Sequence, residues 1–247
     1  MALIRFAGED RKERMGINLI RLFPTYHVSY IDPFLLLDHF AIQIPGGFPD
    51  HPHRGFEIIT YVLQGALAHA DSAGHESVIE ERGVQKVLAG RGIVHSEMPA
   101  TSGIDSGLQL WINLPRAEKG IDPSYQEVRP DELPEESLDG VQIRHLVGGG
   151  SPVEMRRSMR YQDVEWSDDR EHFFDIPAGY QGFLYVLSGE GRLGKDSEYA
   201  TKGDLFFLTT EAGNVQMPAM GSADFRIVFA VGQPVGERPI FNGSFVD

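Results

Sequence analysis

The stretch Glu57-Ile58-Ile59-Thr60-Tyr61-Val62-Leu63-Gln64-Gly65 is rich in β-branched and aromatic residues and ends at a glycine. This composition is typical of a strand that runs into a turn. Similar runs lie at 107–114 and 225–231, and the 28 glycines and 15 prolines are spread along the chain. The sequence therefore predicts an all-β sandwich or barrel, with helix expected only at minor places near 123–125 and 158–165.

The same stretch has a second copy further along the chain. Its core, Tyr-Val-Leu-x-Gly, recurs at residues 185–189, inside Gln181-Gly182-Phe183-Leu184-Tyr185-Val186-Leu187-Ser188-Gly189. A second glycine follows each copy at a similar spacing, in Gly83-Val84-Gln85 and in Gly203-Asp204-Leu205. Two matches in the same order indicate a duplicated β unit. We expect an N-terminal domain over 1–125 and a C-terminal domain over 126–247.

Two short segments with the same spacing carry the chemistry of the chain. They are His51-Pro52-His53 and His95-Ser96-Glu97. Side chains two apart in a strand point to the same face, so each segment presents two ligand-type groups to one space. If the two strands are neighbours, three imidazoles and a carboxylate converge. Such nitrogen and oxygen donors suit iron, copper, nickel, manganese or zinc.

The duplication predicts that the C-terminal half lacks this site. Counting from the repeated glycines, without insertions, gives the positions that correspond to the four donors. They are Asp175, Pro177, Val215 and Met217. A proline, a valine and a methionine cannot replace hard ligands. We therefore expect one metal-binding half and one half without metal.

Composition excludes several other kinds of protein. The chain has no cysteine, which excludes disulfides, iron–sulfur clusters and thiol catalysis. No stretch approaches the about 18 apolar residues of a membrane helix, and the N-terminus becomes charged too early for a signal peptide. The net charge of −14 disfavours direct binding to nucleic acid. A cytoplasmic protein without membrane or nucleic-acid contacts is the expectation.

Four longer strings make the chain similar to a known family. They are Asp32-Pro33-Phe34-Leu35-Leu36-Leu37-Asp38, His51-Pro52-His53-Arg54-Gly55-Phe56-Glu57, Ala89-Gly90-Arg91-Gly92-Ile93-Val94-His95-Ser96-Glu97 and Leu108-Gln109-Leu110-Trp111-Ile112-Asn113-Leu114-Pro115. The first histidine motif and the later glycine–histidine motif resemble the cupin double motif of jelly-roll barrels. The complete strings resemble the pirin family, densely over 21–115 and more thinly in the second half.

The resemblance implies a bicupin fold of two stacked cupin domains, with one metal ion, usually iron, in the N-terminal domain. The ligands of the family fall on His51, His53, His95 and Glu97. Many cupins instead use the glutamate of the first motif. Here one residue more than in that pattern separates Glu57 from Gly65, and the changed strand parity argues against Glu57 as a ligand.

Some bacterial pirins resemble quercetinases, so the first hypothesis is a metal-dependent quercetin 2,3-dioxygenase-like oxidoreductase. It would cleave a flavonol or a similar small aromatic with O2. Iron(II) is the expected ion, with copper, nickel, manganese, cobalt and zinc as alternatives. Glu97 would be both the fourth ligand and the catalytic base. The alternative is a non-catalytic metal-binding redox sensor that acts through a protein partner, because the mammalian protein is associated with transcriptional co-regulation.

For several other residues we considered a structural role beside a functional one. His69-Ala70-Asp71 repeats the two-apart spacing, but a hydrogen-bonded pair at a hairpin end is the interpretation we adopt. Gly90-Arg91-Gly92 predicts a tight turn before His95. Arg54 is either an anion-binding group or a partner in an ion pair. The side chains that are close to the ligand segments in sequence, and that either line a pocket or pack in the core, are Phe48, Phe56, Met98, Gln109 and Trp111.

Overall fold

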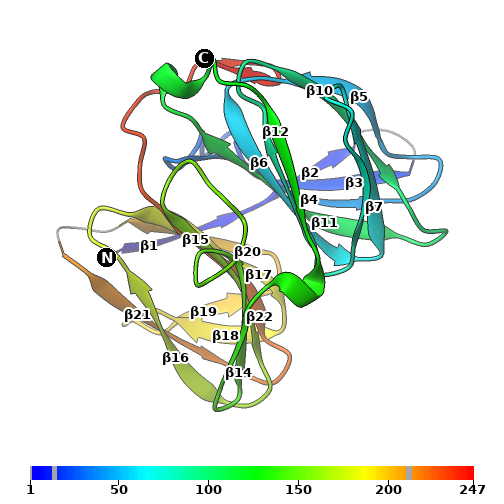
Figure 1. Cartoon of the computed structure of the whole chain (residues 1–247). Helices are drawn as coiled ribbons and strands as arrows, with labels where there is room; N and C mark the ends of the chain where they lie inside the picture. The colour runs from blue at the N-terminus through cyan, green and yellow to red at the C-terminus, as the bar shows by residue number, and fades with distance from the viewer. Residues whose placement is uncertain (1, 13–15, 210–212) are drawn as a thin grey trace. The chain divides into compact units, whose positions relative to one another are not determined.

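The computed structural model describes residues 2–12, 16–209 and 213–247. Within them the chain forms strands and two short 3-10 turns, η1 (Arg116–Glu118) and η2 (Pro130–Glu132), which confirms the all-β fold. The described part contains no helix with the length and apolarity that a membrane crossing requires. The strands divide between two compact units (Figure 1). We call Glu9–Glu132 with Val235–Asp247 the first barrel, and Met1–Gly8 with Leu133–Pro234 the second barrel.

The first barrel contains a seven-stranded sheet and a four-stranded sheet. The larger sheet has the order β12-β9-β6-β11-β4-β3-β2, and the smaller has the order β5-β10-β7-β8. Their bounds are β2 (Glu9–Lys12), β3 (Ile17–Phe23), β4 (Phe34–Ile42), β5 (Phe48–His53), β6 (Phe56–Gln64), β7 (Ala66–Asp71), β8 (Glu76–Glu80), β9 (Val84–Leu88), β10 (Ile93–Pro99), β11 (Asp105–Asn113) and β12 (Ser124–Val128). The repeated stretch at 57–65 is therefore a central strand and its turn.

The second barrel repeats this arrangement strand for strand. Its sheets have the orders β1-β20-β17-β22-β15-β14-β13 and β16-β21-β18-β19. Their bounds are β1 (Ala2–Ala7), β13 (Glu135–Leu138), β14 (Val141–Val147), β15 (Met159–Trp166), β16 (Arg170–Ile176), β17 (Gln181–Ser188), β18 (Glu190–Leu193), β19 (Glu198–Thr201), β20 (Asp204–Thr209), β21 (Val215–Gly221) and β22 (Arg226–Gly232). The two Tyr-Val-Leu-x-Gly stretches form β6 and β17 in equivalent places, as expected of a duplication.

The bounds of the two barrels differ from the expected division into 1–125 and 126–247. Each end of the chain lies in the barrel that is formed mostly by the other half of the sequence. Strand β1 pairs along its whole length with β20 of the second barrel. In the first barrel the same edge is filled by β12, which pairs with β9. The last residues form a small hairpin, β23 (Phe241–Asn242) and β24 (Phe245–Val246), that belongs to the first barrel.

The minor helices expected near 123–125 and 158–165 are wrong. These residues lie in or beside strands β12 and β15. Strand β15 is held on both sides, by β14 and by β22. Pairing with two neighbours satisfies the backbone of such a segment whatever its local preference, which is why the local pattern misleads here.

Buried apolar side chains of the described residues form clusters in both barrels. One cluster of the second barrel is drawn from both of its sheets and includes Phe174, Phe206, Met217 and Phe229. In the first barrel, one cluster surrounds Phe56 and Trp111 and another surrounds Phe40 and Val62. The buried polar residues described next lie outside these clusters.

Candidate metal centre

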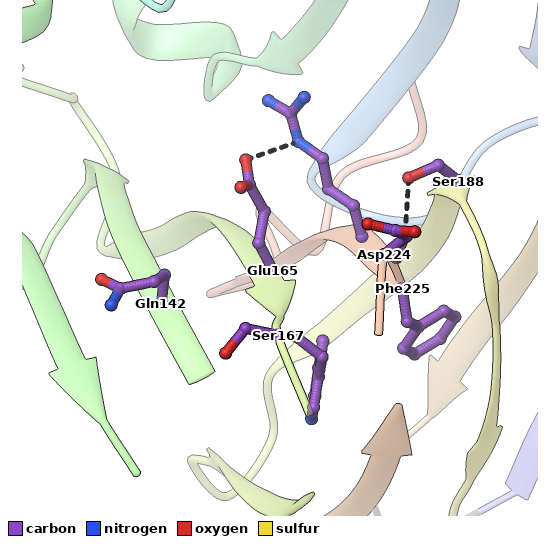
Figure 2. A pocket seen from close by; sticks show the side chains of 8 residues that line it. Gln142, Glu165, Ser167, Ser188, Asp224 and Phe225 are labelled. Atoms are coloured by element: carbon purple, nitrogen blue, oxygen red, sulfur yellow. Dashed lines mark hydrogen bonds and ion pairs between the residues drawn. The ribbon is translucent and has the colours of Figure 1, made fainter. Parts of the chain in front are cut away.

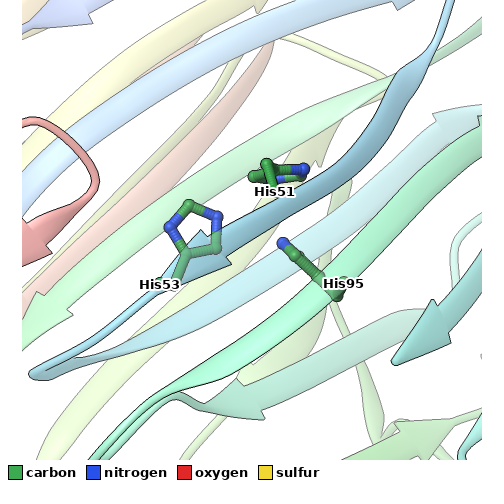
Figure 3. Close-up of side chains that lie close together, drawn as sticks. All are labelled: His51, His53 and His95. Carbon is green, nitrogen blue, oxygen red and sulfur yellow. The ribbon is translucent and has the colours of Figure 1, made fainter. Parts of the chain in front are cut away.

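Three histidines meet between two neighbouring strands of the first barrel. Strands β5 and β10 are antiparallel, and His51 lies directly opposite His95. His53, two residues on, projects from the same face as His51 (Figure 3). One ring nitrogen from each histidine lies within 4.8 Å of those of the other two. The strand spacing seen in the sequence therefore brings the three imidazoles together at a distance that one ion can span.

The three rings are packed against one another, with His53 and His95 buried and His51 partly exposed. Their centroids lie 4.7 Å apart for His51 and His53, 4.5 Å for His51 and His95, and 4.9 Å for His53 and His95. Burial, reinforced by the neighbouring histidines, lowers the pKa of His53 to about 2 and that of His95 to about 3. Both imidazoles are thus neutral at physiological pH, which is the form that binds a metal.

The hydrogen-bonding state of the rings fits a metal site. Neither ring nitrogen of His53 or His95 meets hydrogen-bond geometry with a protein group, although all four atoms are buried, and the Ser244 backbone lies near enough to His53 to act on its pKa. Buried polar atoms are normally paired, so unpaired ones call for an ion or another ligand. His51 is oriented differently, because its Nδ1 lies 2.8 Å from the carbonyl oxygen of Pro49. Donation to that carbonyl leaves Nε2 free as a ligand, a common outer-shell arrangement.

Glu97 lines the same cavity as His51 and His53, but its carboxylate oxygens are not among the ligand atoms that lie within 4.8 Å of one another, and a row of donors holds them instead. Its Oε1 accepts hydrogen bonds from Thr60 Oγ1, at 3.1 Å, and from the amide of Gln85. Its Oε2 accepts one from Gln109 Nε2 at 2.6 Å. Thr60 pairs with Gln85 on one side and with Gln109 on the other, so the three donors stand side by side across β9, β6 and β11. Burial raises the pKa of Glu97, while Thr60 and Gln109 act in the opposite direction.

A cavity of about 320 Å³ opens next to this group. Trp111 forms part of its wall, and its indole Nε1 donates to Gln109 Oε1 at 3.1 Å, which extends the network from Glu97 to the cavity. Phe56 lies behind this wall, stacked on Trp111 with centroids 4.2 Å apart. The residues that line the cavity are Leu19, Arg21, Asp38, Phe40, Phe48, His51, His53, Glu97, Gln109, Trp111 and Ser244.

The comparisons with known proteins agree with this geometry. A family model described as Pirin matches residues 16–112, and one described as the Pirin C-terminal cupin domain matches residues 161–247. A pirin-like protein of Solanum lycopersicum is 42% identical over 240 residues, which cover 96% of this chain and 82% of the relative. The chain belongs to the pirin family. Its two barrels are the two cupin-type domains of a pirin.

Solved structures are similar over nearly the whole chain. The protein GK1651 of Geobacillus kaustophilus is 30% identical, with a TM-score of 0.88, and the match covers 95% of this chain and 96% of that one. A quercetin 2,3-dioxygenase of Acinetobacter baumannii is 25% identical, with a TM-score of 0.88, covering 98% of this chain and 90% of that one. This pirin thus shares its fold with a protein named quercetin 2,3-dioxygenase.

In the second cupin domain, apolar side chains occupy the positions of the four donors. Counted from Gly65 and Gly189, His69 and Leu193 are equivalent, and their partners across the sheet are Glu97 and Ala219. Extending this register gives the counterparts of His51, His53, His95 and Glu97 as Phe174, Ile176, Met217 and Ala219. The positions expected from sequence, Asp175, Pro177, Val215 and Met217, are shifted by one or two residues. The assumption of no insertions was wrong. Two residues separate β5 from β6, but four separate β16 from β17. In addition, Thr60 lies opposite the residue two after Gly83, whereas Leu184 lies opposite the residue three after Gly203.

The donors around Glu97 are replaced in the same way. The row Gln85–Thr60–Gln109 of the first domain corresponds to Phe206–Leu184–Phe229 of the second. All three belong to the continuous apolar core, in which Phe174 stacks on Phe229 at 4.4 Å. The polar centre therefore interrupts the core of the first domain, and hydrocarbon fills the equivalent space in the second.

The remaining sequence candidates have structural roles. His69 Nε2 lies 3.3 Å from Asp71 Oδ2 at the end of the β7–β8 hairpin, which confirms the expected pair. Arg54 forms an ion pair with Asp247 at 2.9 Å. Glu57 is buried and pairs with Lys86 at 3.1 Å, on the face of β6 opposite to Thr60. Of the residues named as pocket candidates, Phe48, Gln109 and Trp111 line the cavity, whereas Phe56 packs in the core and Met98 is exposed.

Five residues at or near the centre carry no signal in the sequence that points to this role, namely Thr60, Gln85, Arg21, Asp38 and Ser244. Thr60 and Gln85 lie inside quoted stretches, but nothing local distinguishes them from core positions. Arg21 and Asp38 form a two-bonded ion pair, at 2.8 and 2.6 Å, across β3 and β4. The order of the strands in the larger sheet brings Thr60 and Gln85 to Glu97 and brings Arg21 and Asp38 to the cavity, whereas Ser244 comes from the turn between β23 and β24.

A second cavity, of about 390 Å³, lies in the second cupin domain (Figure 2). Its polar groups interact among themselves. Glu165 pairs with Arg226 at 3.1 Å, and the hydroxyl of Ser188 donates to the backbone oxygen of Asp224 at 2.9 Å. It has no part in the three-histidine group, which lies wholly in the first domain.

Proposed function

We propose that this pirin is a metal-dependent oxygenase of the quercetin 2,3-dioxygenase type that acts on a flavonol or a similar aromatic compound. One observation carries the proposal. Two buried histidines with unpaired ring nitrogens, a third histidine and a fixed carboxylate adjoin a cavity with aromatic walls. The similarity to a quercetin 2,3-dioxygenase of Acinetobacter baumannii supports the same reaction class.

His51, His53 and His95 would hold the ion, with Glu97 as the fourth ligand. Nitrogen and oxygen donors suit several divalent ions, namely iron, copper, nickel, manganese, cobalt and zinc. Among them we propose iron(II), the ion that the resemblance to pirins implies. When bound, the ion would act as a Lewis acid for the substrate's oxygen and as the site of O2 chemistry. The low pKa values of His53 and His95 keep protons from competing for their nitrogens at neutral pH.

The protein's own residues supply orientation and proton transfer. Phe48 and Trp111 offer flat apolar surfaces against which an aromatic ring can pack. Glu97 would take the proton of the substrate's hydroxyl group, because a carboxylate in a buried site with raised pKa is a competent base. Thr60, Gln85 and Gln109 keep its two oxygens in place while it does so.

The test is direct observation of the complex and its reaction. Iron-loaded protein is mixed with quercetin without oxygen, and the absorption band of the flavonol is recorded before and after air is admitted. We expect a shifted band on mixing and an oxygen-dependent loss of colour with release of carbon monoxide. His53→Ala, with its metal content determined by elemental analysis, is the control.

The opposite result would favour the alternative function. A protein that contains stoichiometric metal but neither shifts the flavonol band nor consumes oxygen is not an oxygenase of this type. A metal-binding redox sensor that acts through a protein partner would then be the better interpretation.

A further inference from the structure

The last residues of the chain form a hairpin on the first cupin domain. Strands β23 and β24 pair with each other, and Ile240 and Asp247 exchange two backbone hydrogen bonds of 2.8 and 2.9 Å. In Figure 1 this hairpin, in red, lies at the end of the domain that also carries β5 and β10. We call residues 240–247 the C-terminal hairpin.

The hairpin is fastened to the two residues that follow His53. The backbone N–H of Val246 donates to the carbonyl oxygen of Arg54 at 2.9 Å. The guanidinium of Arg54 pairs with the carboxylate of Asp247 at 2.9 Å and lies 4.9 Å from the ring centroid of Phe245. Gly55 makes the approach possible, because a Cβ at this position would lie 1.9 Å from the carbonyl oxygen of Val246.

The hairpin is also anchored in the core. The side chain of Val246 is fully buried and belongs to the cluster that contains Phe56 and Trp111. Both of those aromatic rings contact His53, with centroid distances of 5.3 and 5.0 Å. The anchor of the hairpin and the packing of this histidine therefore share the same side chains.

His53 lies between two cavities, and the hairpin contributes to both. Ser244 lines the 320 Å³ cavity that contains His51 and Glu97. Phe245, the next residue, lines a separate cavity of about 270 Å³ whose lining also includes His53. The hairpin thus adjoins His53 in both cavities.

We propose that the C-terminal hairpin is a retaining strap for the metal ion. It holds His53 in its ligating position through Arg54 and Gly55, and it closes the path by which water or a chelator reaches this ligand. The proposal rests on the metal-binding part of the proposed function and is independent of the oxygenase reaction. Groups that orient the ligands of a metal commonly change its affinity by about 10- to 100-fold.

The test is the rate at which a chelator removes cobalt(II), whose visible absorption reports the bound ion. The strap variant is Val246→Ala with Asp247→Ala, which removes the core anchor and the ion pair. The matched control is Val62→Ala with Asp131→Ala. It deletes the same groups from another core cluster of this domain and from an exposed ion pair. Hydrogen exchange of residues 241–246 shows whether the strap has loosened.

We expect EDTA to remove cobalt at least about tenfold faster from the strap variant than from the wild type, with the control close to the wild type. Asp247→Ala alone, which cannot disturb the core, should give a smaller acceleration. Equal release rates in the strap variant and the wild type, or equal acceleration in the control, would overturn the proposal. Failure to take up any cobalt would contradict the metal site itself, whereas a lack of flavonol turnover would leave the result standing.

Discussion

At the scale of single residues, the orientation of the Glu97 carboxylate is fixed by the hydrogen-bond donors that face it. The amides of Gln85 and Gln109 each point an NH2 group at one of its oxygens. In Glu97→Gln, an NH2 group replaces one carboxylate oxygen and then faces the NH2 group of Gln109. We expect the free energy of unfolding of the metal-free protein to fall by about 1–3 kcal/mol, because a buried donor is left unpaired. Much of the metal should remain, and turnover should fall by about 10²- to 10⁴-fold with the loss of the base.

A double exchange separates these two effects. In Glu97→Gln with Gln109→Glu, the new amide at 97 donates to the new carboxylate at 109, which still accepts from Trp111. Urea unfolding should show that stability is recovered, whereas oxygen-consumption assays should show that turnover is not. Undiminished turnover in a Glu97→Gln protein that keeps its metal would retire the assignment of Glu97 as the base.

The buried histidines make the metal-free protein sensitive to acid. Unfolded histidine binds a proton below about pH 6.5, whereas folded His53 and His95 remain neutral down to about 2 and 3. Over this range the unfolded state holds more protons, so the free energy of unfolding falls as the pH falls. Each histidine contributes about 1.4 kcal/mol per pH unit once well below 6.5.

Urea titrations with a chelator at pH 7.5 and pH 5.5 measure this dependence. His53→Gln removes one of the two groups, so its stability should fall less on acidification than that of the wild type. Glu97, whose pKa is raised, acts in the opposite direction and is common to both proteins. Identical pH dependence in the two proteins would show that His53 is not held neutral by burial.

For individual strands, local sequence predicted which side chains share a face but not which strands are neighbours. The spacing of His51 and His53 fixes their common direction in any strand, and the same holds for His95 and Glu97. The donors to Glu97 come from β6, β9 and β11, and nothing in those segments indicates that they are adjacent. Thr60 in a run of apolar residues is an ordinary strand residue until the sheet order is known.

The glycine that ends β6 shows how an element is terminated. Gly65 has a φ of +77°, and a Cβ there would lie 2.0 Å from Asp105 Oδ1, which accepts the backbone N–H of Ala66. Gly74 in the β7–β8 turn also has a positive φ, of +93°, but no atom lies within 4 Å of its Cβ position. Alanine at either site costs about 1–2 kcal/mol of backbone strain. Only at Gly65 does it also displace Asp105.

We therefore expect Gly65→Ala to lower the urea midpoint more than Gly74→Ala does. Because the backbone cost is similar in the two variants, the difference isolates the steric contact with Asp105. Equal midpoints would mean that Asp105 moves aside freely, and that the glycine of the repeated motif is retained for its backbone conformation alone.

Across the whole molecule, one architecture is used twice with different interiors. The repeated motif predicted the duplication because it marks the same strand and turn in each domain. The repeat did not predict that β1 belongs to the second domain and the C-terminal hairpin to the first. Neither segment lies within the repeated sequence, so nothing in it indicates which strands they contact. In the second domain Phe174, Phe206 and Phe229 fill the space that holds His51, Gln85 and Gln109 in the first. Metal should therefore stabilise one domain and leave the other unchanged.

Hydrogen exchange with and without metal tests this asymmetry. A ligand at roughly 1,000 times its Kd stabilises the state that binds it by about 4 kcal/mol. Removal of the ion should accelerate exchange in β5 and β10, because the buried ring nitrogens of His53 and His95 are then left without a ligand. Strands β16 and β21 should exchange at the same rate in both samples, since Ile176 and Met217 pack in a continuous apolar core. Equal acceleration in the two pairs of strands would mean that the ion stabilises both domains, and that the continuous core of the second does not make it independent of the metal centre.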